Sequence, residues 1–224
     1  MKNSLTTGPG VGSKEHLRLA LIPYGRFGPF QRHFARFKIL MDPMFPRLAD
    51  FVRPGWKVMD VGCGYGVTAA WLLAIYPDLR FLACDPDQER ARVAALVLDS
   101  RGEVLPCRAQ DLPLENVKAD AVLCLDILHY LSDRELGEFL DRARPVLPLE
   151  GRLIIRVTIP GKRLRFLRLV EMTKLRFRGL KYYYRGVEET IGLIEQAGFQ
   201  VELTEPTAPG WEEIWLIARI KEGG

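Results

Sequence analysis

The residues that most clearly suggest chemistry form one short run, VMDVGCGYG, at positions 58–66. Asp60 stands ahead of three alternating glycines, Gly62, Gly64 and Gly66. Glycine lets the backbone turn sharply and approach a ligand without a Cβ in the way. A dinucleotide-binding loop would read G-x-G-x-x-G, but the chain has Val67 where the last glycine would stand. An acid at this place suits a ligand with positive charge or many donors, because a pyrophosphate binds bare N–H groups at a helix N-terminus.

The elements that must position this run alternate along the chain from about residue 48. Apolar runs predicted as strands, each followed or preceded by a helical run, lie at 56–61, 80–85, 103–109, 119–126 and 151–159. They are apolar throughout, as strands covered on both faces are. After a helix at 186–199, two more strands are predicted at 200–206 and 212–220. This order predicts a Rossmann-like, doubly wound α/β fold with a mostly parallel seven-stranded sheet, helices on both faces and an antiparallel C-terminal strand.

The run DVGCGYG resembles the first motif of the class I S-adenosylmethionine-dependent methyltransferases, in their small-molecule branch. The resemblance covers roughly residues 48 to 220, and three later strings carry it further: FLACDPD, AQDLP and LCLDILHYL. A looser resemblance, on YGRFGPFQRHFARFKILMDP and LDILHYL, is to a bacterial subgroup associated with aryl-polyene and related lipid pathways. The resemblance implies S-adenosylmethionine as cofactor, S-adenosylhomocysteine as product, and no metal.

The resemblance also implies a role for individual residues. Asp85, the acid that ends the second strand, would accept hydrogen bonds from both ribose hydroxyls. Asp111 would accept from the adenine amino group while Leu112 packs on the base, and Leu125 and Asp126 would lie beside the methionine end. The predicted cofactor-binding residues are Asp60, Gly62, Cys63, Gly64, Asp85, Pro86, Gln110, Asp111, Leu112, Leu125 and Asp126.

Each of these motifs also has an ordinary structural interpretation. A glycine-rich turn after a strand can be a tight connection, Asp85 before Pro86 can form a turn, and Asp111 can cap a helix. Because the motifs follow one another in the order and spacing of the family, we favour the cofactor interpretation.

His129 is the candidate general base, because it lies just past the fourth strand and an imidazole titrates near neutral pH. The alternative is that it packs against the cofactor loop or orients a neighbour. Tyr130 and Tyr183 are predicted to line the acceptor pocket. Tyr24 and His33 are also predicted to contact the acceptor.

Tyr24 and His33 belong to residues 1–47, expected to form a flexible tail and lid helices ahead of the methyltransferase domain at 48–224. For them core packing is the alternative to a lid.

The methyltransferase domain would carry a basic insertion at about 161–185, where nine Lys/Arg and one acid interleave with apolar residues. Such a segment suits an anionic membrane surface, an acyl carrier protein or a lipid-like substrate. RNA, with three adjacent tyrosines as stacking surfaces, and a solvated helix are the alternatives.

The sequence therefore predicts methyl transfer from S-adenosylmethionine to a small-molecule, lipid-like or carrier-bound acceptor. An RNA methyltransferase and a non-catalytic cofactor-binding scaffold are the alternatives, and nucleic acid is the less favoured partner because no separate RNA-binding module is present. The cysteines and histidines are too scattered for a zinc site. With neither a signal-peptide centre nor an apolar run near 20 residues, we expect a cytoplasmic protein, with peripheral attachment to the inner face of the membrane as an option.

Overall fold

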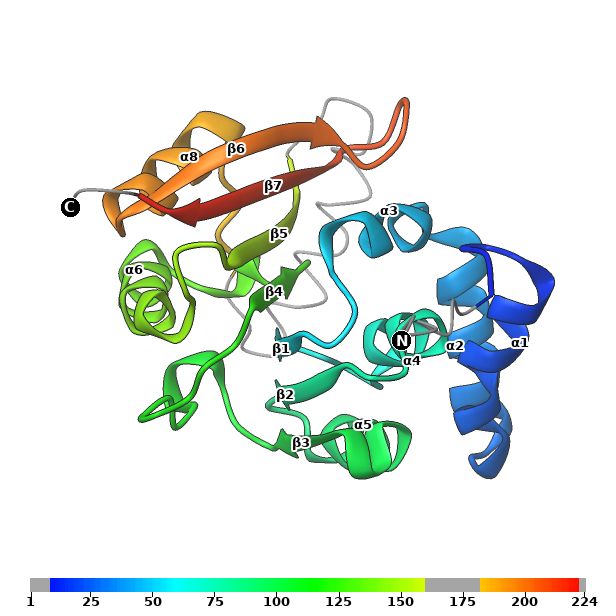
Figure 1. Cartoon of the computed structure of the whole chain (residues 1–224). Coiled ribbons are helices and arrows are strands. Elements are labelled where there is room, and N and C mark those ends of the chain that lie inside the picture. The colour runs from blue at the N-terminus through cyan, green and yellow to red at the C-terminus, as the bar shows by residue number, and fades with distance from the viewer. Residues whose placement is uncertain (1–8, 160–181, 222–224) are drawn as a thin grey trace, which may run out of the picture. The chain divides into compact units, whose positions relative to one another are not determined.

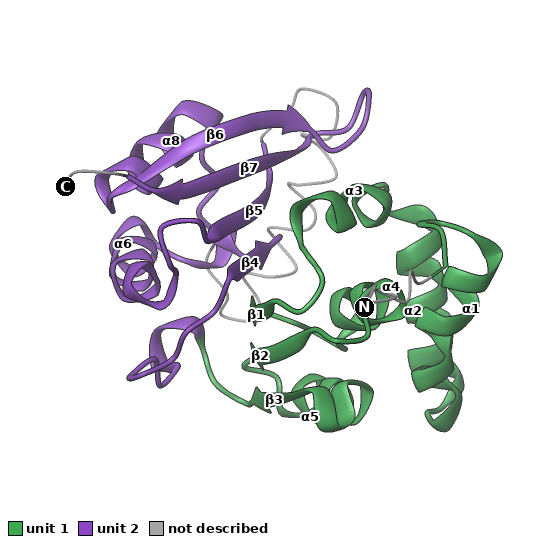
Figure 2. Ribbon diagram, in the orientation of Figure 1, with its two compact units in different colours: residues 1–108 green, residues 109–224 purple. Residues whose placement is uncertain are grey.

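The computed structural model describes residues 9–159 and 182–221. The chain divides into two compact units, residues 1–108 and 109–224, coloured green and purple in Figure 2. The seven strands form a sheet in the order β3-β2-β1-β4-β5-β7-β6, in which β7 pairs antiparallel with both β5 and β6. The other pairings described are parallel. The predicted mostly parallel, seven-stranded α/β fold with an antiparallel C-terminal strand is confirmed.

The first unit holds three helices ahead of its strands. Its helices and strands are α1 (Lys14–Leu21), a 3₁₀ turn (Ile22–Arg26), α2 (Pro29–Met41), α3 (Met44–Phe51), β1 (Lys57–Val61), α4 (Val67–Ile75), β2 (Arg80–Cys84), α5 (Gln88–Leu98), a second 3₁₀ turn (Asp99–Arg101) and β3 (Gly102–Leu105). Helix α4 is buried almost all round, which explains its nearly continuous apolar sequence. Figure 1 shows α1 and α2 beside α4, and contacts join both helices to it.

A buried histidine anchors the first of these helices. His16 is fully buried, its Nδ1 accepts a hydrogen bond from the Gly12 N–H at 3.0 Å, and its Nε2 lies 3.0 Å from the Trp71 carbonyl oxygen on α4. Because Nδ1 is an acceptor, Nε2 carries the proton and donates to that carbonyl. Burial lowers the pKa of His16, which keeps the ring neutral. The two bonds tie the start of the chain to the centre of unit 1.

The second unit contains the remaining strands and two described helices. Its elements are a 3₁₀ turn (Ala109–Asp111), β4 (Ala121–Leu125), η4 (Leu128–Tyr130), α6 (Asp133–Ala143), a further 3₁₀ turn (Arg144–Val146), β5 (Arg152–Thr158), α8 (Val187–Gln196), β6 (Phe199–Pro206) and β7 (Glu213–Ile220). Helix α6 begins with a capping box, in which Ser132 and Glu135 satisfy each other's backbone N–H groups. In the part of the chain that is described, no helix is both long and apolar enough to cross a membrane.

Most of the predicted basic insertion lies outside the described residues, namely its residues 161–181. Its last member, Arg185, is described, and it is not a solvent-facing cation. The guanidinium is buried, donates to the Asp133 carboxylate at 2.7 Å and to the Leu128 and Leu131 carbonyls at 3.0 and 2.6 Å. Arg185 therefore holds η4 to the start of α6, and its charge should not be counted in a basic surface.

We expect replacement of His16 by Phe to destabilise unit 1. Phe keeps an aromatic ring, although a larger one, but the Gly12 N–H and the buried Trp71 carbonyl lose their partner, which costs about 1–3 kcal/mol. Urea unfolding measures the loss. His33→Phe is the matched control, because His33 is exposed on α2 and should change stability by less than about 0.5 kcal/mol. Equal stability of the two variants would contradict the anchoring role of His16.

Candidate functional site

The glycine run folds into a tight loop after β1 that is fastened to the end of β2. The N–H groups of Gly62 and Cys63 both donate to the Cys84 carbonyl oxygen, at 2.8 and 2.9 Å. Gly62 and Gly64 have φ values of 76° and 54°, which side chains rarely adopt. A Cβ placed on Gly64 would meet nothing within 4 Å, so its backbone faces open space. The third glycine, Gly66, also has a positive φ, 74°, and it serves packing as well, because its Cβ would lie 3.1 Å from Cα of Ala94 on α5.

Asp85 joins this loop to the turn that follows β2. One carboxylate oxygen accepts from the Gly64 N–H at 2.9 Å, and the other accepts from the Asp87 N–H at 3.0 Å. The second bond is the turn-forming role given above as the alternative, and contact of Asp85 with the ribose stays a prediction. A carboxylate has about four lone-pair positions, so each oxygen keeps capacity for a ligand hydroxyl.

Asp60 carries an unsatisfied carboxylate oxygen in the first unit. It is fully buried, and its Oδ2 has no hydrogen-bond partner among the described residues. Burial, together with the negative charge of Asp85, raises the pKa of Asp60 to about 7. A buried acceptor without a partner is costly unless a ligand donor or positive charge completes it. With the open face at Gly64, this arrangement fits S-adenosylmethionine, which carries a sulfonium, an ammonium and a ribose diol.

Aromatic residues from the N-terminal segment support the loop. Tyr24 is 1% exposed, and its hydroxyl donates to the Tyr65 carbonyl oxygen within the loop at 2.9 Å. The Tyr65 ring meets Phe30 and Phe34 of α2 edge to face, at 6.1 and 5.1 Å between centroids. The core-packing alternative therefore describes Tyr24, and its burial gives no support to acceptor contact. His33 is exposed on α2, and its predicted role stays a prediction.

The other first-unit candidates differ in exposure. Cys63 is buried, and burial raises the pKa of its thiol, which stays protonated. Pro86 is exposed in the turn after β2. Cofactor contact by either residue stays a prediction.

In the second unit, Asp126 follows β4 and forms a bidentate ion pair that the sequence did not indicate. Its two oxygens accept from Nε and Nη2 of Arg156 at 2.8 and 2.6 Å, and Arg156 is buried within β5. Asp126 also has a φ of 60°, in the left-handed region. The carboxylate predicted to face the methionine end is thus first of all the counter-charge of Arg156. Leu125, before it, is half-buried.

The third predicted motif is held in place by another arginine. The Arg142 guanidinium, on α6, donates to the carbonyl oxygens of Gln110 and Leu112. Asp111 between them is exposed, which leaves its carboxylate accessible, whereas Leu112 is fully buried. The side chain of Leu112 is already covered by protein, so packing on an adenine would need it to move. The role of this motif stays a prediction.

His129 lies in a cluster of aromatic rings, which we call the η4 cluster: His129, Tyr130, Tyr182 and Tyr184. The imidazole is nearly parallel to the Tyr182 and Tyr184 rings, with centroids 5.2 and 5.9 Å away. Tyr183 takes part through its backbone, because its N–H donates to the His129 carbonyl at 2.8 Å. Burial lowers the pKa of His129, although the charge of Asp126 opposes the shift. The ring is therefore neutral at pH 7 and able to accept a proton.

Among the described residues, no group of three or more His, Cys, Asp or Glu is placed to hold a metal ion. The one described cavity is in the first unit between α1 and α2, and its lining includes none of the glycine-loop residues.

The strand order and the fastened glycine loop after β1 define the class: the chain has the class I methyltransferase fold. Residues 58–151 match the protein family described as "Methyltransferase domain". The solved structure of human N-acetylserotonin methyltransferase in complex with S-adenosylmethionine has the same fold. Its TM-score is 0.64 at 17% identity, over 86% of this chain and 55% of that one.

Two curated relatives are similar over part of the chain. The "Probable tRNA methyltransferase 9B" of Bos taurus is 29% identical over 127 residues, which are 54% of this chain and 26% of the relative. The "Flavonoid 7-O-methyltransferase 1B" of Mentha piperita is 31% identical over 105 residues, 44% of this chain and 27% of the relative. The matched part is thus about a quarter of the length of each relative. The two relatives act on different kinds of acceptor.

The glycine loop generates a paired prediction. Gly66→Ala should lower the stability of unit 1 by about 1–3 kcal/mol, because the new Cβ presses on Ala94. Gly64→Ala should cost only the strain of its positive φ, about 1 kcal/mol, yet weaken S-adenosylmethionine binding at least about tenfold by filling the open face. Urea unfolding and titration calorimetry measure the two effects. Wild-type affinity in Gly64→Ala would remove the loop from the cofactor site.

Asp60 generates a pH prediction. Its raised pKa means that the carboxyl is mostly neutral at pH 6 and mostly ionised at pH 7.5. A cationic ligand prefers the ionised form, so the affinity for S-adenosylmethionine should rise about tenfold from pH 6 to 7.5. Calorimetry at several pH values measures this slope.

Asp60→Asn should flatten the slope and weaken binding at pH 7.5. The matched control is Glu103→Gln, an exposed acid of β3 that should keep the slope. A slope unchanged in Asp60→Asn would assign the titrating group elsewhere.

Proposed function

We propose that this protein transfers a methyl group from S-adenosylmethionine to a small-molecule acceptor. The observation that carries the proposal is the loop after β1, where an open glycine backbone, an unsatisfied buried Asp60 and the Asp85 carboxylate occur together. A donor-rich cation matches all three. The family match over residues 58–151 supports the same activity.

The bound cofactor would supply a methyl group on a positively charged sulfur, already activated for in-line displacement by a nucleophile. The chain's own residues then have three tasks. Gly62 and Gly64 allow close backbone approach, Asp85 accepts from hydroxyl donors, and Asp60 offers a negative charge in a buried place. Since the leaving group needs no proton, the acid–base chemistry concerns the acceptor alone.

His129 is our candidate for that acid–base step. An acceptor hydroxyl becomes a better nucleophile when a neutral base removes its proton, and the lowered pKa of His129 keeps its imidazole neutral at pH 7. Its ring is held by Tyr182 and Tyr184, and its backbone is fixed by Tyr183. These contacts support a base with one orientation. The exposed Tyr130 ring in the same cluster suits contact with a planar or apolar acceptor.

The distribution of charged residues along the chain lets us propose a narrower class of acceptor. The predicted basic segment and the acid-free run from His16 to Met41 favour an amphiphilic acceptor, lipid-like or bound to an acyl carrier protein. The relative from Bos taurus favours a second candidate, RNA methylation, because its printed name concerns tRNA. A scaffold that binds the cofactor without turnover is the third.

We expect His129→Gln to lower kcat by about 10²–10⁴-fold while the affinity for S-adenosylmethionine is unchanged, because the base is lost and the glycine loop is intact. Formation of S-adenosylhomocysteine is measured on a panel of phenols, hydroxy fatty acids, acyl-carrier thioesters and a tRNA mixture. Tyr130→Phe is the matched control, since it keeps the ring and removes only the hydroxyl that lies 3.3 Å from the Tyr182 hydroxyl.

The outcomes separate the candidates. Turnover only with tRNA would replace the small-molecule proposal by the second candidate. Tight cofactor binding with no turnover on any acceptor would favour the scaffold. Full activity in His129→Gln would exclude His129 as the base. In the wild type, kcat should fall on acidification as His129 becomes protonated, below the ordinary titration range of histidine because burial lowers its pKa.

A further inference from the structure

Helix α2 has apolar residues on two opposite sides. Ala35 and Ile39 are buried against unit 1. At 100° per residue, another set spaced i, i+4, i+7 and i+11 falls within a narrow strip on the opposite side. We call this set the α2 stripe: Phe30, Phe34, Phe37 and Met41, with exposures of 63, 38, 66 and 58%.

The stripe is partly anchored and partly open. Phe30 and Phe34 stack with a centroid separation of 6.2 Å and rest on Tyr65 of the glycine loop. Phe37 and Met41, one and two turns further on, have most of their surface exposed, as has the neighbouring Leu40. Single exposed apolar residues are common, but a continuous row of large ones marks an interaction surface.

The exposed cations of α2 lie away from the stripe, because at 100° per residue Arg32 and Arg36 fall about 170° and about 130° around the helix from its centre. Residues 16–41 contain five Lys/Arg and no Asp or Glu. Arg32 and Arg36 are exposed on α2, and within the described ranges neither has a carboxylate partner. Lys38 is paired with Asp42, which lies just past the end of the helix. The helix thus combines aromatic residues with unneutralised positive charge.

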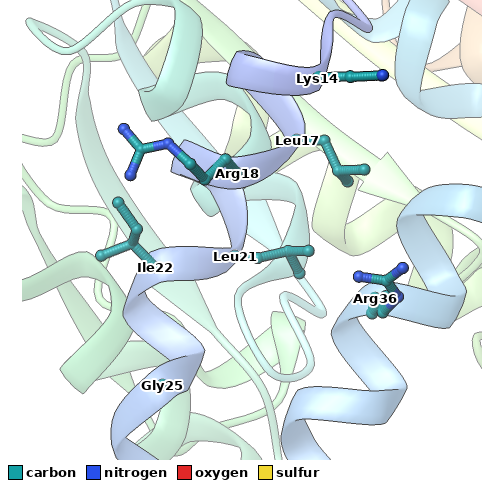
Figure 3. Close-up of a pocket in the computed structure, with 7 residues that line it drawn as sticks. All are labelled: Lys14, Leu17, Arg18, Leu21, Ile22, Gly25 and Arg36. Carbon is teal, nitrogen blue, oxygen red and sulfur yellow. The ribbon is translucent and has the colours of Figure 1, made fainter.

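A groove between α1 and α2 continues the same character. Its cavity volume is about 400 Å³, with Leu17, Leu21 and Ile22 among the lining residues and Lys14 and Arg36 at its edges. In Figure 3, Lys14, Leu17 and Leu21 project from α1 on the side of α2, where Arg36 lies. The groove is therefore apolar inside and positive at its edges, which matches an amphiphile with an anionic head.

We propose that the α2 stripe docks unit 1 on an anionic phospholipid bilayer, with the cations on the other sides of the helix attracted to the lipid over about a Debye length. An interfacial helix buries aromatic and aliphatic side chains at the level of the head groups while Lys and Arg meet anionic lipid. A second copy of the chain would bring Arg32 and Arg36 close to the same two cations, and the acids on either side of this segment, Glu15 and Asp42, are already paired with Arg18 and Lys38. RNA would supply anions and bases on which Phe37 can stack, but it has no apolar interior for the aliphatic Met41 and Leu40. The inference does not depend on methyl transfer.

Vesicle flotation tests the apolar part. The protein should float with vesicles of equal phosphatidylglycerol and phosphatidylcholine and stay behind with phosphatidylcholine alone. Phe37→Ser with Met41→Ser should weaken partitioning at least about tenfold, because two large side chains no longer enter the lipid. Leu149→Ser is the matched control: Leu149 is 61% exposed but lies in unit 2, and its loss should change nothing. Thermal melts verify that each variant is folded.

The contribution of the cations is tested with a second double variant and its matched control. Arg32→Gln with Arg36→Gln should weaken binding to the anionic vesicles about tenfold or more, and salt should weaken the wild type likewise. Arg80→Gln with Arg108→Gln removes two exposed cations elsewhere in unit 1 and should have little effect.

Three results would overturn the inference. One is failure of the wild type to float with anionic vesicles; another is equal flotation of the Phe37/Met41 variant. The third is a dimer in sedimentation, or a shifted RNA, that is lost in that variant while vesicles have no effect. Calorimetry with S-adenosylmethionine on the same samples separates this outcome from failure of the proposed function.

Discussion

The conformation of the candidate cofactor loop depends on one carboxylate, that of Asp85. Asp85 receives the Gly64 N–H on one oxygen and the Asp87 N–H on the other, so one side chain fixes the glycine loop and the start of α5 together. The Cys84 carbonyl adds two further bonds to the loop just before it. Because the loop is fixed from β2, its glycines can keep positive φ values and an open face without collapsing onto the protein. Preorganisation of this kind is what binding a charged ligand requires.

In the second unit, buried arginines hold the turns and helix ends in place. Arg185 donates to two carbonyls around η4 and to Asp133, and Arg156 is held by Asp126. A guanidinium has five donors in a fixed plane, so it can fasten several backbone groups that would otherwise be unsatisfied. The turn that carries His129 is thereby positioned by charge on one side and by aromatic rings on the other. Such a support suits the role of base that we propose for His129.

The fold was predictable from the sequence because apolar runs and helical runs alternate with clear glycine and proline breaks, and these are local signals. The position of the glycine loop after the first strand was predictable for the same reason, whereas the cofactor role of Asp85 came from the family resemblance and stays a prediction. The buried arginines were not predictable. Arg156 sits in an otherwise apolar run, and Arg185 ends a basic one, so composition suggested neither burial nor a partner. Such burial depends on carboxylates and carbonyls from distant parts of the chain, which periodicity does not reveal. His16 was missed as an anchor for this reason too, whereas core packing of Tyr24 was named only as the alternative to a lid.

The pairing of Asp126 with Arg156 has a consequence for how this family of sequences can change over time. Glycine would relieve the left-handed backbone at position 126, yet it would remove the carboxylate that accepts two hydrogen bonds from the buried Arg156 guanidinium. Replacing the arginine alone would take both of these donors away from the half-buried Asp126. Neither position can drift by itself, so lineages that lose one member should have lost the other, and the two columns should covary although thirty residues separate them.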